Sequence, residues 1–415
     1  MVLFIMRGGL NMKRVVFHVD VNSAFLSWSA TQMVNEGKED IRLVPSVVSG
    51  DPNKRTSVVL AKSIPAKVFK INTGEPITMA LRKCRDLVIV PPDFKLYSKF
   101  SKAFKDICRE YSPCVEEFSI DECFMDMSGM EHMYPDIIAT AYELKDRIKN
   151  ELGFTVNVGV GDNKLLAKMA SDFEKPDKVH TLFSNEIETK MWVLPVRDLL
   201  FLGRASAEKL DKLYIRTIGD LANADINILK TTLGNKAGEQ LHNSANGIDD
   251  SPVEDKPREA KSYGHSITVE EDVTDYATAN KLLLALCDAA SSRMRADGLK
   301  AYNISVNIRD NHFKNKSHQQ QLDNATDITK DIYEIAKTLL CDIWNGKTPL
   351  RLIGVSLSDV TKDSAEQISL FGSDSSATDK KRNLDAAVDS IRNRFGDSKI
   401  LLGSTINSKR PKKKG

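Results

Sequence analysis

The stretch FSIDECFMDMSG, residues 118–129, places two neighbouring carboxylates, Asp121 and Glu122, inside an apolar run that is typical of a buried strand. Charged side chains are rarely buried without a partner, and neighbouring side chains of a regular strand point to opposite faces of the sheet. Both acids can therefore face one site only if the regular strand is interrupted there. A cation would also have to balance their negative charges.

The segments on either side of this stretch follow the order of a ferredoxin-like sheet. Residues 42–90 mix short strands with short helices and are set apart as an insertion. Without it, residues 14–173 read strand, helix, strand, strand, helix, strand, which is the split βαβ order. The segments are a strand over 14–19, helices over 23–36 and 95–112, the strands VEEFSI and CFMDM, a helix over 135–151, the strand TVNVGVG and a helix from NKLLAKMASDF.

This strand order predicts where the acids meet. In the ferredoxin-like fold the third strand lies between the first and the second and runs antiparallel to both. The turn that precedes the third strand therefore lies at the same edge of the sheet as the end of the first strand. Asp20 ends the first strand, and Asp121 and Glu122 lie at that turn, where the alternation of side chains lapses. We expect the three carboxylates to converge.

Converging carboxylates favour a divalent cation. Crowded acids raise one another's pKa unless a cation intervenes, and Mg²⁺ binds through a few carboxylates together with substrate phosphates. Two such ions can hold both the attacking and the leaving oxygen of a phosphoryl transfer. An isolated Asp-Glu pair is more often an ordinary solvated turn, and the pattern alone leaves a polymerase and a nucleotide cyclase as alternatives.

The rest of the chain predicts further domains. Residues 194–225 read as helices around a glycine-containing turn, a helix-hairpin-helix that suits a DNA backbone phosphate. Residues 249–262 form a polar, proline-containing linker, and 263–360 form a second unit of alternating strands and helices. Beyond residue 361 the composition turns polar, with one further helix at NLDAAVDSIRNRF. The whole predicts an α+β, multidomain architecture.

Composition narrows the class of protein. The 415 residues are 41% hydrophobic and 28% charged with a net charge of only +2, so a nucleic-acid surface must come from local clustering. The six cysteines form no CxxC or Cys/His ligand spacing, which predicts reduced thiols and no structural zinc. The opening MVLFIMRGGLNM is too short for a secretory signal, Met12 is an equally plausible first residue, and no apolar run approaches membrane length. We expect a cytoplasmic, monomeric protein with no membrane partner.

Three motifs resemble those of Y-family translesion DNA polymerases, particularly the DNA polymerase IV and UmuC-like branch. They are FHVDVNSAF (17–25), EEFSIDECFMDMSG (116–129) and VNVGVGDNKLLAKMASDFEKP (156–176), and the resemblance covers about 13–360. It implies an N-terminal extension (1–12), a ferredoxin-like palm (13–36 and 95–185), inserted fingers (37–94), a helix-hairpin-helix thumb (186–250), a linker (251–262), an α/β little finger (263–360) and a flexible C-terminal tail (361–415).

The resemblance implies roles for individual residues. Asp20, Asp121 and Glu122 match the family's catalytic metal ligands, and the carbonyl of Val21 is a further candidate ligand for the two Mg²⁺ ions. Phe25 matches the steric gate, an aromatic ring beneath the sugar that leaves no room for a 2′-hydroxyl and so selects deoxynucleotides. Any one of these residues alone would more often be an ordinary core or surface residue.

Two lysines are candidates for the nucleotide's phosphates. Lys164 lies in the first turn of a helix, where the amides and its ammonium suit a triphosphate. At the second expected phosphate contact the family usually carries a Tyr and, three residues later, an Arg. This chain has Ile64 and Lys67 there. Lys67 keeps the positive charge but lacks the guanidinium that binds a phosphate through two hydrogen bonds. Asn22 stands where many relatives have a second Asp, so we do not count it as a metal ligand.

Other residues are candidates for DNA and a protein partner. The hairpin turn Phe201-Leu202-Gly203 lacks the first glycine of the usual GxG, which weakens its expected contact with phosphate. The cations expected to neutralise DNA phosphates are Arg293, Arg295, Lys300, Arg309, Lys314 and Lys316. QISLF resembles the peptide that binds the bacterial sliding clamp, and its key residues are Gln367, Leu370 and Phe371.

The sequence therefore predicts a bacterial, template-directed DNA polymerase of the translesion type. Its expected partners are primer-template DNA, deoxynucleoside triphosphates and the sliding clamp, and no acidic cluster indicates a proofreading exonuclease. A catalytically weak DNA-binding scaffold of the same fold, recruited to the clamp, is the first alternative, because Ile64 and Lys67 depart from the family pattern. A cyclase-like enzyme that acts on free nucleotides is the second.

Overall fold

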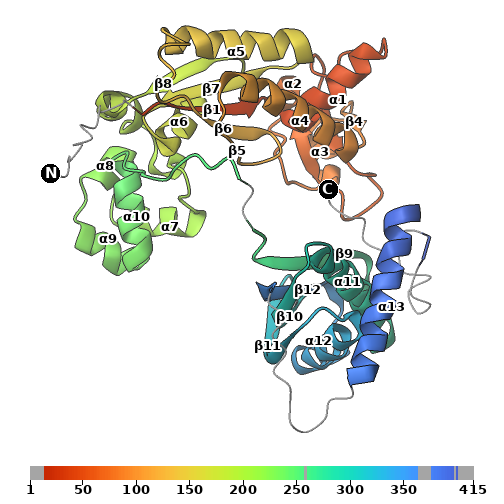
Figure 1. The fold of residues 1–415 in the computed structure, drawn as a ribbon. Helices are drawn as coiled ribbons and strands as arrows, with labels where there is room; N and C mark the ends of the chain where they lie inside the picture. Colours follow the sequence, from red (N-terminus) through yellow and green to blue (C-terminus); the bar gives the residue numbers. More distant parts are fainter. Residues whose placement is uncertain (1–13, 257–258, 363–374, 397–398, 401–415) are drawn as a thin grey trace, which may run out of the picture. The chain divides into compact units, whose positions relative to one another are not determined.

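The computed structural model of the chain describes residues 14–256, 259–362, 375–396 and 399–400. The chain divides into two compact units, one formed by residues 1–53 and 57–257 and the other by 54–56 and 258–415 (Figure 1). The first unit contains the predicted acids, and the second contains the cations predicted on the little finger.

Five strands form the sheet of the first unit: β1 Val16–Val21, β5 Val115–Glu117, β6 Glu122–Asp126, β7 Val156–Gly161 and β8 Val179–Leu182. Their order is β5-β6-β1-β7-β8. β6 lies between β5 and β1 and is antiparallel to both, which confirms the predicted ferredoxin-like order. β8 is an additional edge strand, parallel to β7, that the sequence pattern did not reveal.

Helices cover both faces of this sheet, so every residue of β1 is buried. They are α1 Ala24–Asn35, α4 Phe94–Tyr111, α5 Ile137–Leu152 and α6 Lys164–Ser171. Phe17 and Val19 pack with α1, α4 and α5 in the main core. Because side chains alternate along a strand, His18 and Asp20 face the opposite side, where His18 contacts Ser171 of α6. Asp20 is thus placed on the face that α6 covers.

A glycine in β7 allows α6 to approach the sheet closely. A Cβ built at Gly159 would lie 1.9 Å from the carbonyl oxygen of Ala167, so a larger residue would push the helix away. The alternate valines of β7 fill the opposite core. The pattern VNVGVG therefore supplies one apolar face and one face small enough to bring α6 next to β1 and β7.

The insertion between α1 and α4 forms a small sheet with its own core. Its elements are β2 Ser46–Ser49, β3 Val59–Lys62, α2 Ile64–Val68, α3 Ile77–Lys83 and β4 Val88–Val90. The sheet order is β3-β2-β4, with β2 antiparallel to β3 and parallel to β4. Val47, Ile71 and Ile77 are among the buried residues that hold the helices against it.

Short helices follow the palm sheet. They are η1 Ser184–Glu186, η2 Ile187–Met191, η3 Val196–Asp198, α7 Arg204–Asp211, α8 Ile218–Ala222, α9 Ile226–Leu233 and α10 Asn235–Ala245. The helix expected before the turn at Phe201–Gly203 is only the single 3₁₀ turn η3. The Val196 amide donates to the carbonyl of Arg216, at 2.7 Å, which ties the start of this segment to a neighbouring one.

The second unit is an antiparallel sheet covered by helices. Its elements are β9 Ser262–Val273, α11 Tyr276–Ala296, β10 Lys300–Asp310, β11 Asn315–Thr326, α12 Thr329–Ile343 and β12 Leu350–Thr361. The sheet order is β11-β10-β12-β9, and α11 and α12 share the apolar core with its inner face. Buried and partly exposed residues alternate along β10: Ile304, Val306 and Ile308 are buried, and Asn307 and Arg309 are partly exposed. β10 therefore has the predicted polar face.

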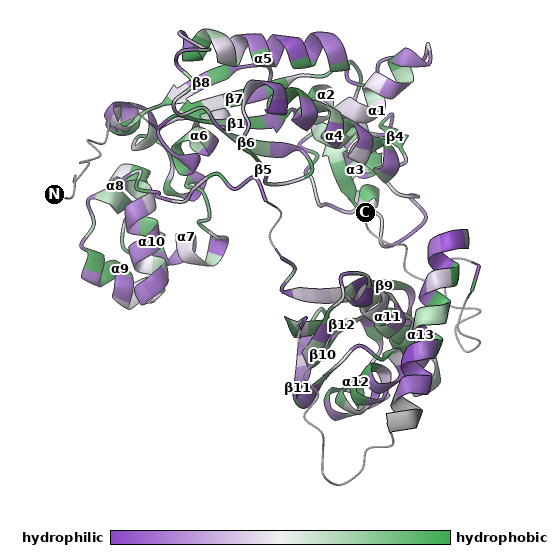
Figure 2. Cartoon of the chain, in the orientation of Figure 1, coloured by the Kyte–Doolittle hydropathy of each residue, from purple (hydrophilic) through white to green (hydrophobic). Residues whose placement is uncertain are grey.

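A final helix, α13 Ser375–Phe395, lies within the segment that we assigned to a flexible tail. Figure 2 shows that hydrophilic residues predominate along it. Its attachment is ionic: the Arg392 guanidinium donates to both carboxylate oxygens of Asp288 on α11, at 2.9 and 3.0 Å, and both side chains are buried. Asp389 accepts from Arg295, at 2.7 Å. The helix is therefore part of the second unit, whereas the clamp-like peptide 367–371 lies outside the described residues.

The Arg392–Asp288 pair makes the attachment of α13 testable. Arg392→Met removes the guanidinium and leaves a buried carboxylate without it, which typically costs about 3–5 kcal/mol. We expect the protection of α13 amides against hydrogen exchange in the full chain to fall by at least about 100-fold. Lys380→Ala, at an exposed position of the same helix, is the matched control. Unchanged protection in Arg392→Met would show that other contacts hold the helix.

Candidate active site

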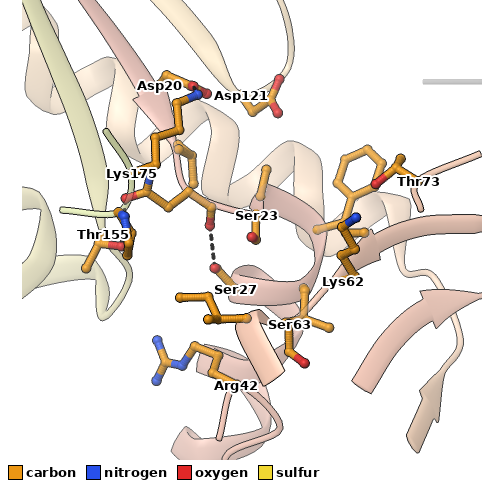
Figure 3. Close-up of a pocket in the computed structure, with 18 of the residues that line it drawn as sticks. Asp20, Ser23, Ser27, Arg42, Lys62, Ser63, Thr73, Asp121, Thr155 and Lys175 are labelled. Carbon is orange, nitrogen blue, oxygen red and sulfur yellow. Dashed lines mark hydrogen bonds and ion pairs between the residues drawn. The ribbon is translucent and has the colours of Figure 1, made fainter. Parts of the chain in front are cut away.

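A pocket of about 510 Å³ opens where β1 ends, and the acids singled out in the sequence line it (Figure 3). Its walls come from the β1–α1 segment, the β5–β6 turn, the inserted sheet with α2, and the loop after α6. The lining residues that carry the chemistry are Asp20, Asp121, Glu122, Phe25, Arg42, Lys62, Lys67 and Lys175. The pocket thus combines an acidic end, an aromatic ring and several cations.

The strand register brings the three acids together. Asp20 and Glu122 are paired residues of β1 and β6, so their side chains share a face of the sheet. Asp121 precedes β6 in the turn, and its carbonyl accepts a hydrogen bond from the Val21 amide, at 3.0 Å. The Asp121 carboxylate accepts from the Ser119 hydroxyl, at 2.6 Å. The structure therefore places the acids as the ferredoxin-like order predicted, with Glu122 as the first residue of the strand.

Asp20 is the most buried of the three acids. Burial raises the pKa of Asp20 to about 6, the nearby charge of Glu122 adds to this, and the ammonium of Lys175 opposes it. Lys175 forms an ion pair with the Asp20 carboxylate and, at 2.8 Å, with that of Asp172. Figure 3 shows Lys175 reaching from its loop to Asp20, beside Asp121. A cation therefore already balances this buried charge.

Glu122 is held from the side of α6. Lys168 donates to its carboxylate at 2.9 Å, and the ring nitrogen Nε2 of buried His18 lies 3.8 Å from the other oxygen. Burial raises the pKa of Glu122, but His18 and Lys168 more than offset this and lower it to about 2. Glu122 is therefore a carboxylate at neutral pH. The sequence motifs did not single out Lys168 or His18 as site residues.

The three acids offer the oxygen atoms that a hard divalent cation takes as ligands, but lysines pair with two of the acids. Within the described ranges, no group of three or more His, Cys, Asp or Glu side chains is arranged to hold a metal ion. Lys175 and Lys168 neutralise two of the three acids in this arrangement. Carboxylate oxygens and a backbone carbonyl such as that of Val21 are nevertheless the ligands that Mg²⁺ prefers. Asp20, Asp121 and Glu122 are the residues that would hold it.

Phe25 is fixed against other aromatic rings. Its ring stacks on that of Tyr97 with centroids 4.6 Å apart and an interplanar angle of 9°, and it meets Phe94 edge to face. Tyr97 is itself fully buried, and its hydroxyl lies 2.9 Å from that of Ser29. Phe25 therefore presents a firmly packed ring to the pocket.

Lys164 does not reach the pocket, which corrects our expectation. Its ammonium lies 2.6 Å from the Glu116 carboxylate and 4.9 Å above the ring of Phe124, away from the lining residues. Glu116 also accepts from the amide of Glu254, at 2.9 Å, and Val253 packs beside Phe124. The first part of the segment expected to be a linker is thus anchored on the palm, and Lys164 takes part in that anchor.

Lys175 occupies the place expected for Lys164. It belongs to the same sequence motif, at its end, directly before Pro176. A residue before proline is biased towards extended backbone, which was a signal that the helix had ended and that this lysine could point back to the sheet. Lys67 of α2 also lines the pocket, and so does exposed Ile64, which cannot contribute a hydroxyl.

The predicted DNA contacts are only partly available. Arg295 is about 10% exposed and is enclosed by Asp385 and Asp389 of α13, so the structure does not support it as a DNA contact. Its pairing depends on a helix that we had treated as part of a tail. Arg293 donates to the carbonyl of Gly264, at 2.6 Å.

The other candidates lie at the ends and turns of strands. Arg309 lies on the polar face of β10 and donates to Asn315, at 2.8 Å. Lys314 lies in the turn between β10 and β11, Lys316 is near the start of β11, and Lys300 begins β10. Gly203 caps the start of α7 with an ordinary negative φ and no atom within 4 Å of a built Cβ, so nothing there requires glycine.

Fold and site together define a palm-type nucleotidyl-transfer protein, and the comparisons agree. The impB/mucB/samB family model matches residues 19–172, its C-terminal domain matches 260–370, and a model described as the DNA polymerase-iota thumb domain matches 197–249. A solved Y-family DNA polymerase chimera matches 84% of this chain and 100% of its own with a TM-score of 0.71 at 22% identity. This confirms the predicted fold class.

Curated relatives extend the match to nearly the full length. The chain is 44% identical to DNA polymerase IV of Clostridium acetobutylicum over 97% of this chain and 100% of that protein. It is 36% identical to DNA polymerase IV of Clostridium kluyveri over 95% and 99%, and 33% identical to DNA polymerase IV 1 of Bacillus subtilis over 97% and 95%. The chain therefore belongs to the impB/mucB/samB family of Y-family DNA polymerases.

No helix in the described part of the chain combines the length and the apolar character that a bilayer crossing needs.

Proposed function

We propose that this protein is a template-directed DNA polymerase of the translesion type, which extends a primer opposite damaged or undamaged template without proofreading. One observation carries the proposal: Asp20 and Glu122 are register-paired, and Asp121 adjoins them, in a pocket that also presents Phe25 and Lys175. Relatives named DNA polymerase IV along nearly the whole chain support the same conclusion.

Several residues of the pocket have a place in the proposed reaction. The primer 3′-hydroxyl loses its proton to solvent beside Glu122 and attacks the α-phosphate of the incoming deoxynucleotide, the bond between the α- and β-phosphates breaks, and pyrophosphate leaves. Two Mg²⁺ ions, held by Asp20, Asp121, Glu122 and the carbonyl of Val21, would neutralise the attacking and leaving oxygens. Lys175 and Lys67 bind the triphosphate oxygens as point charges. Phe25 lies beneath the sugar and excludes a 2′-hydroxyl.

The proposal is tested by primer extension on an undamaged template and then on one with a single abasic site. We expect extension on both with Mg²⁺ and none when EDTA removes it, with a lower rate past the abasic site. DNA binding in EDTA, measured by fluorescence anisotropy, is expected to remain. Extension in EDTA would contradict the metal mechanism, and failure to pass the lesion would contradict the translesion assignment.

A catalytically weak scaffold is the alternative that the pocket keeps open. Ile64 and Lys67 replace the residues usual at the phosphate contact, and Lys168 and Lys175 already neutralise two of the acids. Binding to primer-template DNA without extension in the same assay would establish this alternative.

The peptide with Gln367, Leu370 and Phe371 would serve either function by binding the sliding clamp. Phe371→Ala is expected to abolish capture of the chain by a purified bacterial clamp.

The two lysines of the third motif are expected to differ. Lys175→Ala should raise KM for the deoxynucleotide by about tenfold or more, because a charged hydrogen bond to the triphosphate is lost. Lys164→Ala should leave KM unchanged and lower the thermal stability, since it leaves Glu116 buried beside Phe124 without its ammonium. Steady-state kinetics and thermal unfolding of both variants measure this. The reverse pattern would restore Lys164 to the triphosphate site.

A further inference from the structure

Asn22, which stands where many relatives have Asp, is the centre of a buried hydrogen-bond network. Its amide oxygen accepts from the Thr155 hydroxyl and from the Asp177 backbone amide, both at 2.9 Å. Its amide nitrogen donates to the side-chain oxygen of Asn157, at 3.1 Å. Asn22 is 7% exposed, so water does not readily replace these bonds.

Asn157 extends the network to the loop after α6. Asn157 is fully buried, is the β7 neighbour of Asp20 in the sheet, and donates to the carbonyls of Ser171 and Glu174, at 3.0 and 2.7 Å. Its oxygen accepts from the Lys178 amide, at 3.3 Å. The two asparagines therefore bind the loop backbone on both sides of Lys175.

The loop is anchored from its outer side as well. Asp177 has the left-handed φ of 61°, which Asp tolerates better than most residues. Its carboxylate accepts from Lys145 and Lys149 of α5, at 2.9 and 2.7 Å. Thr155 lies at the base of Lys175, where β7 begins (Figure 3). The backbone that carries Lys175 is thus held rigidly while its ammonium extends into the pocket.

The amide at position 22 is suited to this task in a way that a carboxylate is not. A side-chain amide has an oxygen that accepts and an NH2 group that donates, and the network uses both: the oxygen accepts from Asp177 and Thr155, and the NH2 group donates to Asn157. A carboxylate would face the Asn157 oxygen without a proton to donate. The partners around position 22 therefore suit an amide and not a carboxylate.

We propose that Asn22 and Asn157 are positioning residues that hold Lys175 at the end of β1 and thereby set the affinity for the nucleotide's triphosphate. This rests on the proposed function, because it assumes that Lys175 binds the triphosphate. The side-chain hydrogen bonds of both asparagines go to each other, to Thr155 and to the loop backbone. Both act through the loop backbone, so their removal affects substrate binding more than the chemical step.

The test is a double-mutant cycle in the full chain with primer-template DNA and one deoxynucleotide. The variants are Asn22→Ala, Lys175→Ala and the pair, with Asn150→Ala, an exposed residue of α5, as the matched control. We expect Asn22→Ala to raise KM by about tenfold with kcat within about twofold of the parent. In the Lys175→Ala background the same change should alter KM by less than about twofold, because its target is gone. Asn157→Ala and the milder Asn22→Ser should follow the same pattern, with thermal unfolding confirming that each variant is folded.

The outcomes separate the inference from the function on which it rests. If Lys175→Ala raises KM and Asn22→Ala does not, or if their effects multiply, the positioning role is wrong and the polymerase assignment stands. If Asn22→Ala and Asn22→Ser lower kcat and thermal stability without changing KM, the network is only structural. If Lys175→Ala leaves KM unchanged, Lys175 does not bind the triphosphate, and the inference falls with that part of the proposed function.

Discussion

Glu122→Gln is expected to abolish primer extension, with a fall in kcat of about 10³-fold or more, while primer-template DNA still binds. The loss follows from the proposed role of the carboxylate in holding a metal ion, which contributes several kcal/mol to the stabilisation of transition-state charge. The side chain keeps its shape in this variant, so the missing charge is what the measurement reports. Glu122→Ala should behave in the same way.

The change also leaves Lys168 without its ionic partner, so stability must be controlled. Lys168 is buried and donates to Glu122 at 2.9 Å. Glu122→Gln combined with Lys168→Met removes both charges and should recover most of the thermal stability while remaining inactive. Glu151→Gln, which breaks an ion pair to Arg147 on the surface of α5 outside the pocket, is the matched control and should extend primers normally. Extension by Glu122→Gln at the parent rate would remove Glu122 from the catalytic site.

Phe25→Ala is expected to admit ribonucleotides, with the preference for deoxynucleotides reduced by roughly 100-fold. The expected clash is between the Phe25 ring and the 2′-hydroxyl of a ribonucleotide. An extra atom in a close-packed site costs about 1–3 kcal/mol, and removing the ring would relieve this cost. The ratio of kcat/KM for the two sugars, with the same base and template, measures the effect. The cavity left beside Tyr97 should also lower stability, because the two rings stack at 4.6 Å.

The control for the gate is Phe25→Tyr, which keeps the ring and its stacking and should retain selection against the ribose. If Phe25→Ala retains the parent's sugar preference, the ring is only a packing residue on Tyr97. If Phe25→Tyr also loses it, the selection depends on the surface of the ring and not on its presence.

Much of the fold was readable from local patterns. The strand order around FSIDECFMDMSG predicted that β6 would lie between β5 and β1, and the register pairs Asp20 with Glu122. Alternation in YNISVNIRD predicted the polar face of β10. Such patterns are readable because a strand or helix that buries one face must repeat its apolar residues with the period of the backbone.

The contact partners of charged residues were harder to predict from the sequence. A lysine at a helix start looked like a phosphate contact, yet Lys164 is paired with Glu116, whereas Lys175, eleven residues later, reaches Asp20. Arg295 looked like a DNA contact and is enclosed by α13. Long charged side chains have no periodicity of their own, and their partners come from segments that are distant in the chain.

For this protein the sequence alone determined the class of fold, the three acids and the ring beside them, since these sit at the ends and turns of regular elements and inside long motifs. Only the tertiary structure decided which lysine enters the pocket, which cations remain on the surface and why position 22 carries an amide. Those outcomes depend on desolvated charges and hydrogen bonds between remote segments, whose energies are set by burial and by a specific partner, and neither is encoded in local spacing.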